Sequence, residues 1–103
     1  MKVKIKDTEF EVKYTLRAMM MWEAITGKRF EIVTITDQWV FYYALLLASN
    51  PETNITFEDF IEACDDDPGI FIQFSEFINV ESKKRNIFKT DDDGSDAEKK
   101  SGQ

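Results

Sequence analysis

Alternating apolar and polar residues open the chain and predict a β-hairpin. Over residues 2–14, apolar positions alternate with Lys and Glu, and the alternation is interrupted once, at Asp7-Thr8. Period-two alternation is typical of strands with one buried face. We expect a turn at Asp7-Thr8, with Lys and Glu opposed across the strands on the solvent face. The apolar positions are Val3, Ile5, Phe10, Val12 and Tyr14.

The next segment predicts an amphipathic helix with two apolar faces. Thr15 is a suitable N-cap, the helix is expected to run to about Thr26, and Gly27 is a natural stop. One stripe follows the spacing i, i+3, i+4, i+7 and consists of Ala18, Met21, Trp22 and Ile25. The opposite side carries Leu16, Met19 and Met20, beside Glu23.

A second helix is expected to form the centre of the core. Residues 30–35 are ambiguous between strand and extended connection, and we favour the extended connection. Thr36-Asp37 then caps a helix that continues through about Ser49 and is apolar all round, a pattern typical of buried helices. Asn50-Pro51 ends it.

Two further helices follow. Thr56 with Asp59 forms a variant of the capping box, and Asp67 with Pro68 marks the start of the fourth helix, which is expected to run to about Lys83. The third helix has an apolar stripe of Phe57, Phe60, Ile61 and Cys64. The fourth carries Phe71, Phe74, Phe77 and Ile78.

These patterns predict an α+β fold, an N-terminal β-hairpin followed by about four α-helices in one small, mostly helical domain. The domain is expected to cover residues 1–88. Residues 89–103 contain no large apolar side chain and are expected to form an acidic, disordered tail.

Composition argues against catalysis and metal binding. The 103 residues include no His and one Cys, which excludes His-dependent catalytic triads, His metal ligands and Cys-cluster zinc sites. The four Gly residues lie too far apart to build a phosphate-binding loop. We expect a protein that is not an enzyme and needs no cofactor. Cys64 is expected to be a small core residue.

Charge and hydropathy limit the classes of partner and the cellular location that we expect. The net charge is −7, and residues 31–81 contain acids but no base, which argues against nucleic-acid binding. The longest apolar run, Trp39 to Ala48, is about half of what a membrane span needs. Residues 1–10 do not resemble a signal peptide, so we expect a cytoplasmic location.

Three consecutive methionines mark the candidate binding face. Met is flexible and polarisable, and Met-rich surfaces suit adaptable protein binding. One interpretation is that both faces of this helix are buried by neighbouring elements. The other is that Met19 and Met20, with Glu23 beside them, line an exposed groove or a self-association face.

The chain resembles the tail-assembly chaperones of long-tailed bacteriophages. In that family a short hairpin precedes a helix that ends in Thr-Gly, and an apolar helix ending in Asn-Pro-Glu follows. The matching residues here are Leu16, Trp22, Ile25, Thr26 and Gly27, then Tyr43, Ala44, Leu45, Asn50 and Pro51. The resemblance covers roughly residues 3–80. The consecutive methionines and the aromatic second helix depart from the family pattern.

The resemblance implies a binding function without ATP. Such a chaperone binds the tail tape-measure protein, keeps its apolar stretches soluble, recruits tail-tube subunits, and leaves before the virion is complete. It would act in the cytoplasm of the host bacterium and be absent from the mature particle. Two alternatives remain open: a phage structural adaptor such as a head–tail connection protein, and a small accessory or regulatory protein.

Overall fold

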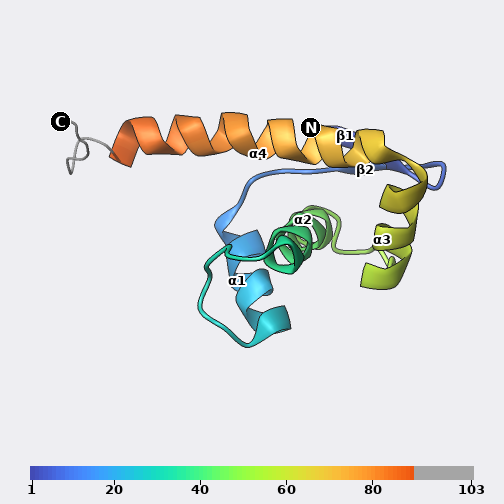
Figure 1. Cartoon of the computed structure of the whole chain (residues 1–103), viewed down its shortest axis with the longest axis horizontal. Coiled ribbons are helices and arrows are strands. Elements are labelled where there is room, and N and C mark those ends of the chain that lie inside the picture. Colours follow the sequence, from blue (N-terminus) through green and yellow to red (C-terminus); the bar gives the residue numbers. More distant parts are fainter. Residues whose placement is uncertain (90–103) are drawn as a thin grey trace.

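The computed structural model describes the backbone of residues 1–89 and the side chains of residues 1–84. It contains an N-terminal antiparallel hairpin followed by four helices in a compact, mostly helical globule, which confirms the predicted α+β fold (Figure 1). Of the predicted tail, only Lys89 belongs to the described part, as the last residue of the final helix. The prediction of disorder in the tail therefore lies outside the described residues.

The hairpin consists of β1 (Lys2–Ile5) and β2 (Thr8–Glu11). Lys2 lies opposite Glu11 and Lys4 opposite Glu9, so the expected Lys–Glu register across the strands is confirmed. The predicted position of the turn is wrong by one residue, because the chain turns at Lys6 and Asp7. Both residues have positive φ, 50° and 67°, as a two-residue hairpin turn that follows the strand twist requires. This earlier turn pairs Thr8 with Ile5 and leaves Tyr14 outside the strand.

Helix α1 (Leu16–Thr26) begins and ends where the sequence predicts. The Thr15 side chain accepts a hydrogen bond from the Ala18 amide at 3.1 Å, as an N-cap residue does, and the same amide also donates to the Thr15 carbonyl at 3.2 Å. Gly27 ends the helix with φ 71°, a left-handed conformation that a residue with a side chain adopts at a cost.

Helix α2 (Ile35–Ser49) forms the middle of the core, as predicted, and contacts α1, α3 and β2. Its predicted cap is wrong. Thr34, rather than Thr36, is the N-cap, and Asp37 is the third helical residue of a complete capping box. The Thr34 amide donates to the Asp37 carboxylate, and the Asp37 amide donates to the Thr34 hydroxyl. Both hydrogen bonds are 3.1 Å long. A Thr-x-x-Asp box satisfies two donors, whereas a cap at Thr36 would leave Asp37 without this role.

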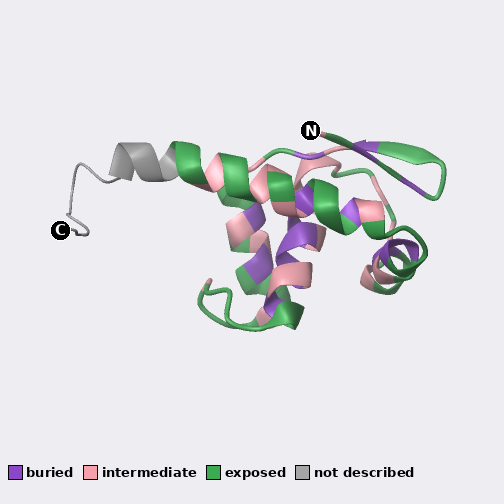
Figure 2. Cartoon of the chain, turned by 45° about the horizontal axis from the view of Figure 1, so that its top comes forward, coloured by how far each residue is buried: buried purple, intermediate pink, exposed green. Residues whose placement is uncertain are grey.

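Helix α3 (Phe57–Asp66) starts at the predicted Thr56 cap, and α4 (Pro68–Lys89) starts at the predicted proline. The expected end of α4 near Lys83 is wrong, since the helix continues to Lys89. Its C-terminal part extends beyond the other elements in both views (Figures 1 and 2). The residues after Lys83 contain no Pro or Gly before Lys89, so nothing in the local sequence stops the helix there.

The core joins both strands to all four helices, with aromatic rings at its centre. Tyr42 of α2 stacks on Phe74 of α4 with ring centroids 5.0 Å apart, and its hydroxyl lies 3.1 Å from Ser75 Oγ. Asn50 ties α2 to the hairpin: its Nδ2 donates to the Glu11 carbonyl at 2.6 Å, and its Oδ1 accepts from the Glu11 amide at 3.2 Å. The fully buried large side chains are Trp22, Tyr42, Phe60, Phe74, Ile5, Leu45, Leu46, Val3 and Val12.

Candidate functional site: an uncovered apolar face on α1

The two sides of α1 have different surroundings. Ala18 and Trp22 are completely buried against the core. On the outer side, Leu16 is 71% exposed and Met20 is 61% exposed. Nothing in the described part of the chain covers this outer side, so two large apolar groups face solvent one helical turn apart.

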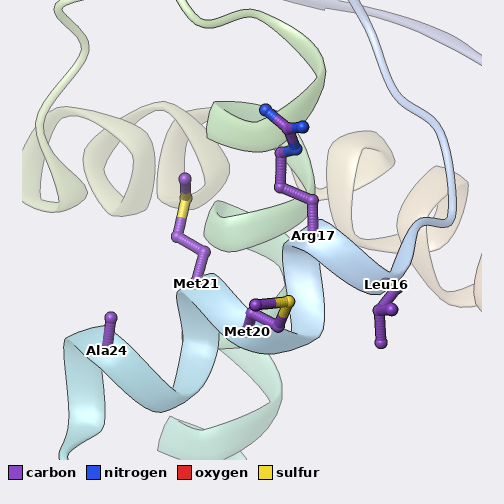
Figure 3. Close-up of a pocket in the computed structure, with 5 residues that line it drawn as sticks. All are labelled: Leu16, Arg17, Met20, Met21 and Ala24. Carbon is purple, nitrogen blue, oxygen red and sulfur yellow. The ribbon is translucent and has the colours of Figure 1, made fainter.

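A shallow groove of about 700 Å³ follows this outer side (Figure 3). It is mostly apolar, with one charged side chain, the guanidinium of Arg17. We call this the α1 groove. Its lining residues are Leu16, Arg17, Met20, Met21 and Ala24.

A second hollow lies between α1 and the end of α2, next to the α1 groove. It has a volume of about 280 Å³ and shares Arg17 and Met21 with the α1 groove. Arg17 and Met21 therefore line both hollows. The remaining residues of the second hollow are Leu47, Ala48, Asn50, Pro51 and Thr53.

The three predicted binding residues have different environments. Met20 lines the α1 groove. Met19 does not line it: this side chain is half-buried and packs against the hydrophobic core. Glu23 is exposed, and its carboxylate accepts a hydrogen bond from the Phe30 amide at 2.7 Å, which holds the segment after α1.

Only part of the predicted apolar stripe of Ala18, Met21, Trp22 and Ile25 is buried. Ala18 and Trp22 are buried, Met21 is half-buried at the groove, and Ile25 is exposed. The sequence-based prediction of the binding face did not include four residues of the groove, which are Leu16, Arg17, Met21 and Ala24. The spacing contains the signal, because Leu16, Met20 and Ala24 follow one another at intervals of four, the spacing of a helix ridge.

The inner side of α1 is held rigidly to the start of α2. The Trp22 indole donates to the Asp37 carbonyl at 2.9 Å, and the Lys28 ammonium lies 3.1 Å from the Asp37 carboxylate. The same ammonium lies over the Trp22 ring, 5.6 Å from its centroid. These contacts hold α1 against α2, so binding of a ligand in the groove would not require the helix to become ordered first.

Asp37 carries the most perturbed carboxyl of this region. Hydrogen bonds from the backbone amides of Thr34 and Val33, with a further bond from Lys28, lower its pKa from 3.8 to about 2. The carboxylate is therefore ionised throughout the physiological range. Its partners are all structural, and they explain the shift without a catalytic role.

Cys64 is a buried free thiol, as predicted. Burial, with the nearby carboxylates of Asp65 and Asp67, raises its pKa to about 12. The thiol is therefore protonated at neutral pH and is a weak nucleophile.

Two structural features are absent from the described residues. Within this part of the chain, no cluster of three or more Cys, Asp or Glu side chains is arranged to hold a metal ion. Among the helices of residues 1–89, none combines the length and the apolar character that crossing a membrane requires.

No family model, curated protein or solved structure matches this chain. The likeness to tail-assembly chaperones therefore depends on the sequence motifs alone.

Proposed function

We propose that the protein is a non-enzymatic tail-assembly chaperone of a long-tailed bacteriophage, which binds apolar helical segments of the tape-measure protein through the α1 groove. The observation that carries the proposal is the exposure of Leu16 and Met20 on a helix whose other side is fixed in the core. Exposed apolar surface of this kind is costly in water and is typical of a protein-binding site.

The shape and chemistry of the groove fit an amphipathic helix. Leu16, Met20 and Ala24 line the groove at intervals of four, and the apolar face of a partner helix can pack against them. The Met side chains adapt to partner residues of different shape, which suits a protein that binds several similar stretches of a long helix.

The rest of the molecule suits stoichiometric binding. The net charge of −7 keeps a protein with an exposed apolar face from aggregating. In this proposal the protein acts in the host cytoplasm by covering tape-measure segments, helps to recruit tail-tube subunits, and is released before the virion is complete.

The test is co-expression with the tape-measure protein encoded in the same genome. The tagged parent should retain the tape-measure protein in the soluble fraction and co-purify with it. The double variant Leu16→Gln plus Met20→Gln should reduce co-purification at least ~10-fold, because both apolar contacts are lost. Met19 stays unchanged, because it packs against the core.

A matched control separates the groove from apolar exposure in general. Val33 is 72% exposed and Ile35 is 69% exposed, and neither lines the α1 groove. The double variant Val33→Gln plus Ile35→Gln should bind like the parent. Equal loss of binding in both double variants, or no binding by the parent, would contradict the proposal. Presence of the protein at a fixed copy number in purified virions would favour the structural adaptor instead.

A further inference from the structure

A second exposed apolar row lies on the outer side of α4. Ile72 is 54% exposed and Val80 is 51% exposed, whereas Phe74 on the inner side is completely buried. Glu76 lies midway between Ile72 and Val80 and is exposed. These three residues follow one another at intervals of four and therefore form one ridge, which we call the α4 ridge. Figure 2 shows exposed segments at intervals along α4.

The α4 ridge and the α1 groove have matching lengths. The groove extends from Leu16 to Ala24 and the ridge from Ile72 to Val80. Each interval is eight residues, which corresponds to about 12 Å along a helix. The two apolar ends of the ridge can therefore contact the two ends of the groove, with Glu76 between them.

Their charges are complementary. Arg17 is the charged residue that lines the α1 groove, and Glu76 is the charged residue within the α4 ridge. In the part of the chain whose side chains are described, neither residue forms an ion pair. A contact between groove and ridge would give each charge a partner and would cover apolar surface on both sides.

One chain cannot make this contact with itself, because both surfaces face outward from the same core. The groove is on the outer side of α1, the ridge lies on the side of α4 away from Phe74, and α2 is the main neighbour of α1. We infer that the occupant of the α1 groove in the isolated protein is the α4 ridge of a second copy, with Glu76 of one copy paired to Arg17 of the other.

The expected association is weak. A contact between two helices over two turns is much smaller than the ~1,600 Å² that a standard stable complex buries. We expect a dissociation constant on the order of 100 µM, so that a partner with a longer apolar helix displaces the second copy. The inference uses the groove of the proposed function but does not depend on the identity of that partner.

Sedimentation velocity of the full chain tests the inference. At about 150 mM salt, which screens the repulsion between two copies of net charge −7, the weight-average mass should rise with protein concentration up to about 500 µM. Arg17→Glu and Glu76→Arg should each weaken association at least ~5-fold, because each places like charges in the contact. The combined variant reverses both charges and should restore association to within about twofold of the parent.

The matched controls are Arg29→Glu and Glu31→Arg, two exposed charges outside both surfaces. Each should leave association within about twofold of the parent. A parent that stays monomeric would overturn the inference, as would a combined variant that is no better than the single variants. If that monomeric parent still binds the tape-measure protein through the groove, the proposed function stands without this inference. If the parent associates as expected but fails to bind the tape-measure protein, the inference stands alone.

Discussion

Helices α1 and α2 are both rich in apolar residues, yet they have opposite roles in the molecule. Seven of the 15 residues of α2 are buried, but only two of the 11 residues of α1 are. Helix α2 has neighbours on several sides, whereas α1 packs mainly on α2. The comparison shows that an apolar side chain stabilises the fold only where another element covers it, and is available for binding where none does.

The sharpest test of the comparison begins with Leu45, which is completely buried in α2. Leu45→Ala should lower the free energy of unfolding by about 2–5 kcal/mol, because it removes buried methyl groups and leaves a cavity. Chemical denaturation monitored by circular dichroism measures the change. A variant as stable as the parent would mean that α2 is not the centre of the core.

Loss of the hydrogen bonds between α2 and the hairpin should have the next largest effect on the free energy of unfolding. Asn50→Ala removes the two hydrogen bonds to Glu11 and leaves that backbone unpaired. We expect a loss of about 1–3 kcal/mol in the free energy of unfolding. Asn54, which is exposed on the next loop, provides the control, since Asn54→Ala should change stability by less than about 0.5 kcal/mol. Equal effects would contradict the bridging role of Asn50.

The stability that the N-terminal cap of α2 contributes should depend on pH. The pKa of Asp37 is about 2 in the folded protein against an ordinary 3.8, so its ionised form favours folding. The resulting stability is present above pH 3.8 and is lost as the pH falls toward 2. Other carboxylates titrate in the same range, so the measurement is the difference in unfolding free energy between the parent and Asp37→Asn. This difference should shrink between pH 4 and pH 2, and a constant difference would contradict the assignment.

The smallest change in the free energy of unfolding is expected from a substitution on the outer side of α1. Leu16→Ala is the same chemical change as Leu45→Ala, but Leu16 is 71% exposed. The free energy of unfolding should change by less than about 0.5 kcal/mol, because little apolar surface is uncovered. Thermal and chemical unfolding of the two variants side by side measure the contrast. A large loss of stability in Leu16→Ala would show that this face is covered after all.

Local patterns were sufficient to predict most of the fold. Strand alternation, the caps at Thr15 and Thr56, the stop at Gly27 and the proline at 68 all depend on residues close together in the chain, and the structure confirms each of them. The cap of α2 could also have been predicted, because Thr34 and Asp37 have the same Thr-x-x-Asp spacing as Thr56 and Asp59. The composition, with no His and one Cys, likewise limits the catalytic and metal-binding sites that the chain can form.

Only the tertiary structure decided which side of α1 is covered. Leu16, Met19 and Met20 are equally apolar, and the sequence places all three on one side of the helix. In the structure, Met19 packs against the core whereas Leu16 and Met20 stay exposed. The physical reason is that burial depends on the position of other elements, and those contacts join residues far apart in the sequence. Helix periodicity determines the direction of a side chain relative to its own helix but not whether a neighbour lies there.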